Sequence, residues 1–170
     1  MRCASDADEE AWAALPSTGR SMGRAEQRTV RLDIPSRVQM LEAADALVGE
    51  MAKAAGFDED SRQDIQVAVH ESLVNAIVHG NHGNEARRVT LQITPHPAGL
   101  EIRVRDEGRG FDPTGVPDPL ALENLSRSSG RGILLMRTFM DDVTFRRPPS
   151  GGTEVTMLKR LPQAVERRSA

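Results

Sequence analysis

The sequence contains a single cysteine, Cys3, among its 170 residues. One thiol excludes an internal disulfide and any zinc site built from cysteines, and it is consistent with a reducing cytoplasm. Long apolar runs are also missing, so the sequence shows neither a signal peptide nor a membrane-spanning segment. We therefore expect a cytoplasmic protein that remains where it is made.

Charge of one sign is not in excess. The chain has 22 basic and 25 acidic residues, which give a formal net charge of -3. This balance produces no strong field that would attract nucleic acid or an anionic membrane, and we expect direct binding to neither. It is typical of a soluble regulator or enzyme.

Hydrophobic residues make up 38% of the chain, which at this length is enough for one sizeable core but not for two full domains. Residues 1–28 are rich in serine, glycine and acidic side chains and show no apolar period. We expect this segment and residues 162–170 to be disordered tails. Residues 29–161 should form the folded domain.

Helical periods and cap signals predict two long helices in the first half of the domain. Ser36 is the expected N-cap of an amphipathic helix over residues 37–55. Asp60 and Gln63 form a capping-box pattern that should open a second helix ending near Gly80.

Alternating apolar and polar residues predict strands on both sides of a third, short helix at residues 131–143. The expected strands are residues 29–35, 88–94, 100–106, 143–147 and 153–161. This order favours an α+β fold, a two-layer α/β sandwich whose mixed, mostly antiparallel sheet carries its helices on one face.

A polar stripe runs along the second helix. Glu71, Asn75 and His79 follow one another at steps of four residues, so they share one slowly drifting face of an otherwise apolar helix that should be largely buried. A buried carboxylate requires hydrogen bonds, a cation or a ligand. The stripe alone is explained at least as well by an internal polar network.

A metal site is a weaker interpretation of the histidines in this region. His79 and His82 lie close in sequence, but His70 and Glu71 are not followed by a histidine at the H-E-x-x-H spacing. We therefore expect no zinc here.

Three further segments carry glycine or hydroxyl groups at positions suited to a ligand. An aspartate and two glycines follow a strand, two glycines open the short helix where free N–H groups favour phosphate, and a threonine enters the last strand. Each has an ordinary structural explanation when taken alone. The residues are Asp106, Gly108, Gly110, Gly130, Gly132 and Thr153.

Taken together, the order and spacing of these segments resemble the nucleotide-binding boxes of the GHKL ATPases, whose ATP-binding architecture is known as the Bergerat fold. Within that superfamily, "VAVHESLVNAIVHG", "GRGILLMRTFMDDVTF" and "GGTEVTMLKR" look most like the anti-sigma-factor serine/threonine protein kinases of bacteria. The resemblance extends from about residue 29 to residue 161.

The resemblance implies a role for each matching residue. Asn75 would coordinate Mg²⁺ held by the nucleotide phosphates, and Glu71 would act as the base or orient the attacking hydroxyl. Asp106 would accept a hydrogen bond from the adenine amine, which guanine lacks. The remaining implied ATP contacts are His79, Gly108, Gly110, Arg127, Gly130, Arg131, Gly132 and Thr153, and residues 111–129 would form the ATP lid.

The function that the resemblance implies is a Mg-ATP-dependent kinase that holds a sigma factor and phosphorylates a STAS-type antagonist. A homodimer is typical of such proteins. A nucleotide-gated binding module without phosphotransfer is the main alternative. An ATPase fragment of a histidine kinase is less favoured, because no dimerisation helix pair with a phosphoacceptor histidine precedes the nucleotide boxes.

Overall fold

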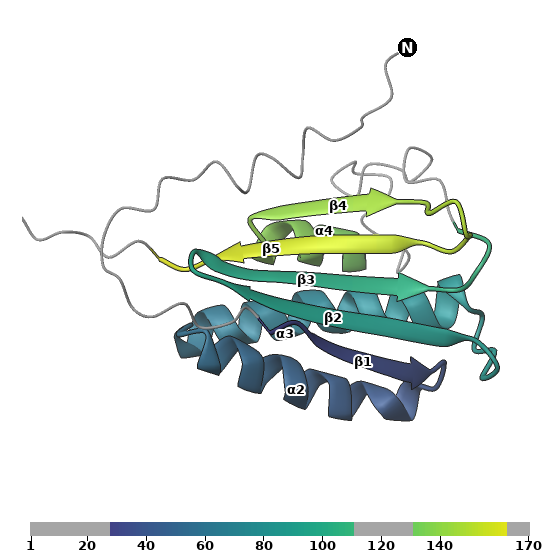
Figure 1. Ribbon diagram of the computed structural model, residues 1–170, viewed down its shortest axis with the longest axis horizontal. Helices are drawn as coiled ribbons and strands as arrows, with labels where there is room; N and C mark the ends of the chain where they lie inside the picture. Colours follow the sequence, from purple (N-terminus) through teal and green to yellow (C-terminus); the bar gives the residue numbers. More distant parts are fainter. Residues whose placement is uncertain (1–27, 111–130, 163–170) are drawn as a thin grey trace, which may run out of the picture.

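The computed structural model describes residues 28–110 and 131–162. They form one five-stranded sheet with helices packed on one of its faces (Figure 1). In chain order the elements are β1 (Val30–Pro35), a 3-10 turn (Val38–Met40), α2 (Leu41–Ala54), α3 (Glu59–Val74), a π-helical segment (Asn75–Gly80), β2 (Arg88–His96), β3 (Gly99–Asp106), α4 (Arg131–Phe139), β4 (Asp142–Arg146) and β5 (Glu154–Arg160).

The strands lie side by side in the order β1-β2-β3-β5-β4. Every neighbouring pair in this sheet is antiparallel. The predicted α+β sandwich with helices on one face is therefore confirmed. The sheet was expected to be mostly antiparallel, and among the described strands it is antiparallel throughout.

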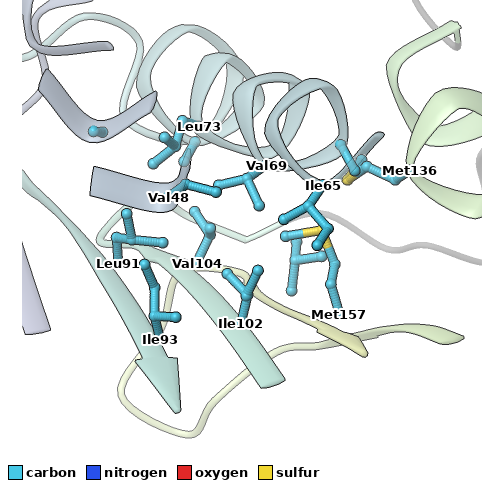
Figure 2. Close-up of a cluster of buried hydrophobic side chains, with 14 of the residues drawn as sticks. Val48, Ile65, Val69, Leu73, Leu91, Ile93, Ile102, Val104, Met136 and Met157 are labelled. Atoms are coloured by element: carbon cyan, nitrogen blue, oxygen red, sulfur yellow. The ribbon is translucent and has the colours of Figure 1, made fainter. Parts of the chain in front are cut away.

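The core lies between the sheet and the helices (Figure 2). Period-two alternation in β2 and β3 and the inner face of α3 supply many of its fully buried side chains, and α2, α4 and β5 supply others. Burying one such aliphatic side chain stabilises the fold by about 1.5–3 kcal/mol. Prominent members are Val48, Ile65, Val69, Leu73, Leu91, Ile93, Ile102, Val104, Met136 and Met157. This packing fixes α3 against β3.

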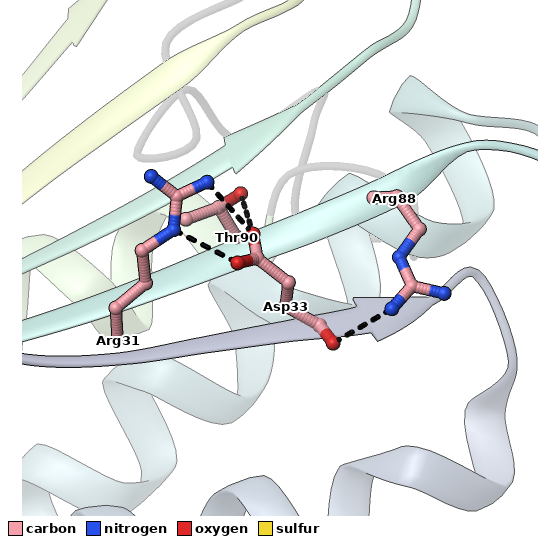
Figure 3. A network of polar contacts seen from close by, with 4 residues as sticks. All are labelled: Arg31, Asp33, Arg88 and Thr90. Atoms are coloured by element: carbon pink, nitrogen blue, oxygen red, sulfur yellow. Dashed lines mark hydrogen bonds and ion pairs between the residues drawn. The ribbon is translucent and has the colours of Figure 1, made fainter.

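The face of the sheet opposite the helices is polar (Figure 3). The Arg31 guanidinium donates to the Asp33 carboxylate at 2.8 and 3.0 Å, and the Thr90 hydroxyl donates to the same carboxylate. Arg88 Nη2 donates to the Asp33 carbonyl oxygen at 3.1 Å. Hydrogen bonds from Arg31 and Thr90 hold the pKa of Asp33 below its usual range. These contacts account for the polar half of the alternation in β1 and β2.

The start of α3 differs from the predicted capping box. The N-cap is Asp58, whose side chain accepts a hydrogen bond from the Ser61 N–H at 2.8 Å. Asp60 lies inside the first turn, and the Gln63 side chain donates to Glu59 instead of reaching back to a cap. Asp58 caps the helix in place of Asp60 because it has the extended backbone that a cap requires.

The burial of α3 and the π-helical segment is also less than expected. Val67 and Val78 are 40% and 42% exposed, so only one side of this helix enters the core. The third helix is shorter than the predicted residues 131–143, because α4 ends at Phe139 and β4 begins at Asp142.

Ser36 is not the helix cap that the sequence predicts, because a buried asparagine, Asn81, engages it. The Ser36 hydroxyl donates to the Arg87 carbonyl oxygen at 2.9 Å and accepts from Asn81 Nδ2 at 2.8 Å. Asn81 Nδ2 also donates to the Arg88 carbonyl oxygen at 2.9 Å, and Asn81 Oδ1 accepts from the Glu107 N–H at 2.9 Å. Asn81 thus joins the ends of β1 and β3 to the start of β2.

We expect Asn81→Ala to lower the free energy of unfolding by about 3 kcal/mol, because it leaves several buried polar groups without partners. Urea denaturation measures this loss. Asn84→Ala is the control, since the hydrogen bond of the Asn84 side chain, accepted from the Ala86 N–H, is exposed and its backbone bonds survive the substitution. A loss of less than about 1 kcal/mol for Asn81→Ala would show that Asn81 does not stabilise this junction.

Candidate functional site

A pocket of about 420 Å³ lies between α3 and the strands β3 and β5. The π-helical segment and the start of α4 close two of its sides. Its walls are apolar where Val104, Ile133, Phe145 and Val155 face it, and charged or polar groups enter from α3 and from the end of β3. A cavity of this size and lining is typical of a small-molecule site.

Glu71 and Asn75 enter the pocket from the last turns of α3 and the first residue of the π-helical segment. Both side chains are half-buried. Gly132 of α4 lies directly against them, since a Cβ at this glycine would stand 2.7 Å from Glu71 Oε2 and 3.4 Å from Asn75 Nδ2. The beginning of α4 therefore approaches both polar groups of the stripe.

The π-helical turn marks this part of the helix as irregular. Asn81 N–H donates to the Ala76 carbonyl oxygen at 2.8 Å, five residues back, and the Gly83 N–H donates to the Ile77 carbonyl oxygen at 2.8 Å. Such turns are rare and occur frequently at functional sites. His79, the third member of the stripe, lines the pocket here and is exposed.

Asp106 supplies a buried carboxylate at the end of β3, with 3% of the residue exposed. Its Oδ1 accepts from the Gly108 N–H at 2.8 Å, and its backbone N–H donates to the Thr153 carbonyl oxygen at 3.0 Å. Within residues 28–110 and 131–162, no cationic side chain pairs with this carboxylate. A buried carboxylate with so few partners is suited to accept from a ligand.

Glycines allow the close packing around Asp106. A Cβ at Gly80 would lie 2.5 Å from Asp106 Cγ, and a Cβ at Gly152 would lie 2.0 Å from the Asp106 carbonyl oxygen. Gly152 also has a φ of 81°, which disfavours any side chain. These contacts fix the carboxylate against the helix on one side and the β5 turn on the other.

For the ATP binding that the resemblance implies, we expect Gly80→Ala to weaken the affinity about tenfold, because the added methyl group must displace the Asp106 carboxylate. Isothermal titration calorimetry measures this change. Gly83→Ala is the control. Gly83 has a left-handed φ of 64°, so this substitution also destabilises the backbone, but nothing lies within 4 Å of the added Cβ. Unchanged ATP affinity in Gly80→Ala would mean that ATP does not contact Asp106.

The structure brings most of the candidate residues together. Gly108 does not line the pocket, and a Cβ there would meet the Gly80 carbonyl oxygen at 2.0 Å. Arg131 is exposed at the start of α4 and does not line the pocket. Arg127, Gly130 and the proposed lid lie outside the described residues. The candidates that line the pocket are Glu71, Asn75, His79, Asp106, Gly110, Gly132 and Thr153.

Sequence reasoning missed several pocket residues. Ser72 and Arg109 line the pocket, but neither falls on a recognisable spacing. Gly80 is visible in the sequence as the glycine that follows the stripe, and its contact with Asp106 explains that position. His82 also lines the pocket, with a left-handed φ of 55° that is uncommon for a histidine.

The described residues contain neither a self-contained metal site nor a helix that could span a membrane. No group of three or more His, Cys, Asp or Glu side chains among them is arranged to hold a metal ion by itself. A hard divalent cation that is also held by a ligand's phosphates fits Asn75, which carries a side-chain oxygen and lines the pocket together with Glu71. No helix in the described part of the chain has the length and apolar character needed to cross a membrane.

Residues 34–159 match the histidine kinase-like ATPase domain family. The chain belongs to this family, since the match covers well over half of its length. The two candidate nucleotide-binding motifs, Glu71–Asn75 and Asp106–Gly110, fall inside the matched region, and residues of both line the pocket.

Two relatives specify the branch of the family. The chain is 28% identical over 120 residues to the serine-protein kinase RsbW of Listeria monocytogenes serovar 1/2a, covering 67% of this chain and 76% of the relative. It is 35% identical over 105 residues to the anti-sigma F factor of Bacillus velezensis, covering 60% of this chain and 71% of the relative. The chain thus belongs to the anti-sigma-factor branch of this GHKL-type family.

A solved structure supports the same fold. The crystal structure of the RsbU and RsbW domains of a Mycobacterium tuberculosis protein superposes with a TM-score of 0.57 at 16% identity. The superposition covers 78% of this chain and 32% of that longer chain. At this identity the likeness shows the fold alone.

Proposed function

We propose that this chain binds Mg-ATP in the pocket and transfers the γ-phosphoryl group to a serine or threonine of a STAS-type anti-sigma-factor antagonist. The observation that carries the proposal is the meeting of Glu71, Asn75 and Asp106 in one pocket of nucleotide size. Relatives named as a serine-protein kinase and an anti-sigma factor support it.

The buried Asp106 carboxylate would bind the base. Its free oxygen accepts from an exocyclic amine, which adenine has at the position where guanine carries a carbonyl group. Thr153, 5% exposed, lines the same pocket and its hydroxyl would support the base. The apolar side chains Val104 and Val155 provide the flat surroundings that a purine ring needs.

Glu71 and Asn75 would serve the other end of the nucleotide. The Asn75 side-chain oxygen is a hard ligand suited to Mg²⁺, which when bound neutralises charge on the phosphates. Glu71 would accept the proton of the acceptor hydroxyl or orient that hydroxyl for in-line attack. Gly132 at the start of α4 lies against Glu71, where backbone N–H groups favour phosphate oxygens. Arg131, just before it, would contact the phosphates as the resemblance implies. His79, Gly108, Gly110, Arg127 and Gly130 complete the proposed set of ATP contacts.

The biological consequence would be partner switching. The chain would hold a sigma factor, release it when the unphosphorylated antagonist competes, and silence the antagonist by phosphorylation. We propose that it acts in the cytoplasm as a homodimer, with no direct contact to nucleic acid or membrane. Labelled γ-phosphate appearing on a serine or threonine of the antagonist, in the presence of Mg-ATP, tests the kinase activity.

A further inference from the structure

Two buried hydroxyl groups in the pocket have no hydrogen-bond partner. Ser72 is 1% exposed and Thr153 is 5% exposed, and neither Ser72 Oγ nor Thr153 Oγ1 is hydrogen bonded to any of the described residues. Both residues line the pocket. Buried hydroxyls are almost always paired, so the missing partners are expected to come from the ligand or from water bound with it.

The hydroxyl of Ser72 is not used within its own helix. A serine inside a helix commonly donates to the carbonyl oxygen four residues back, which here belongs to Ala68. That bond is absent, because Ser72 Oγ has no partner within the part of the chain that the structure describes. The hydroxyl therefore remains available to the pocket.

The neighbours of Ser72 on α3 leave room for a ring. Ala68 on α3, one turn before Ser72, and Ala76 in the π-helical segment, one turn after it, are also buried and small, and Ala76 lines the pocket. Leu73, the next residue along the chain, instead fills the core. The small residues let the ligand approach the helix at Ser72.

Asp106 and Ser72 offer complementary hydrogen-bonding groups. The Asp106 carboxylate accepts, whereas a serine hydroxyl can donate. Adenine presents an amine donor next to a ring-nitrogen acceptor, N1, while guanine presents a carbonyl acceptor next to an N–H donor. The Asp106 acceptor and the Ser72 donor, which line one pocket, can therefore both hydrogen bond to the edge of adenine. The edge of guanine would place an acceptor against Asp106 and a donor against Ser72.

We infer that Ser72 is a specificity-determining residue, whose hydroxyl donates to adenine N1 directly or through one water that also bonds Thr153. The inference rests on the proposed function, since it assigns a residue to the base of the bound ATP. The Ser72 contact, made from α3, would add to the contact with the adenine amine that is expected from Asp106.

Calorimetric titration of Ser72→Ala with ATP and with 1-deaza-ATP, in which N1 is replaced by C–H, tests the inference. We expect the substitution to raise the dissociation constant for ATP about tenfold, since one buried hydrogen bond is lost. For 1-deaza-ATP the same substitution should change the dissociation constant by less than about twofold, because that analogue has no N1 acceptor. Ser61→Ala, in the first turn of α3, is the matched control.

Two results would overturn the inference. An unchanged ATP dissociation constant in Ser72→Ala would show that the hydroxyl does not contact the base. An equal loss of affinity for both nucleotides would show that Ser72 acts through the packing of α3. Failure of the wild-type chain to bind ATP would instead overturn the proposed function, so the two failures are distinguishable.

Discussion

Glu71→Gln should lower the rate of phosphoryl transfer by about 100-fold or more, because an amide cannot accept the proton that a carboxylate accepts. ATP binding should change by less than about threefold, since Gln preserves the shape of the side chain. Shape matters here because Gly132 leaves little space beside Glu71 Oε2. Single-turnover transfer from labelled Mg-ATP measures the rate, and calorimetry measures the affinity.

The matched control for Glu71 is Glu50→Gln, an exposed glutamate on α2 outside the pocket. It should transfer phosphate at the wild-type rate. Transfer by Glu71→Gln at an undiminished rate would contradict the role of Glu71 as base or orienting group. Loss of ATP binding in the same variant would mean that Glu71 acts on nucleotide affinity.

Asp106→Asn should weaken ATP binding about 100-fold, which corresponds to about 2.7 kcal/mol of binding free energy. The substitution removes a charged acceptor from the adenine amine and can present an N–H group to it. The fold should survive, because an asparagine oxygen can still accept from the Gly108 N–H in place of Asp106 Oδ1. Calorimetric titration with ATP and circular dichroism measure the two effects.

Asp142→Asn is the control for the loss of an acidic group, since Asp142 is exposed at the start of β4. It should leave ATP affinity unchanged. A titration with GTP adds a second comparison, because Asp106 should disfavour guanine in the wild type. ATP affinity that survives in Asp106→Asn would place the base elsewhere in the pocket or outside it.

The fold was predictable from the sequence because, over most of the chain, the spacing of apolar residues and the residues that end helices and strands indicate the same elements. Val30, Leu32 and Ile34 alternate as a strand should, and the apolar period of α2 matches its buried face. The helix starts were less predictable. Ser36 and Asp60 are good capping residues by type, but tertiary contacts and backbone geometry decide which residue caps.

The candidate site was predictable where residues lie at a fixed spacing on one element. Glu71 and Asn75 face one pocket because four residues complete about one helical turn. The contact of Gly80 with Asp106, and the unpartnered hydroxyl of Ser72, depend on how α3 packs against β3. Such contacts join residues far apart in the chain, so no local sequence pattern predicts them.

Arg127 and Gly130 lie outside the described residues, and their proposed roles toward the phosphates stay predictions. The domain limits at residues 29 and 161 likewise stay predictions, although the family match at residues 34–159 falls inside them. Arg131 is exposed beside the pocket and does not line it, so its role as a phosphate contact rests on the resemblance alone.

The most direct test of the proposed kinase activity is transfer of labelled γ-phosphate from Mg-ATP to each STAS-type protein encoded by the source organism. We expect one of them to become labelled on a serine or threonine, and we expect this labelling to require Glu71. If the chain binds ATP tightly and labels none of them, the kinase assignment is contradicted and a nucleotide-gated binding module takes its place.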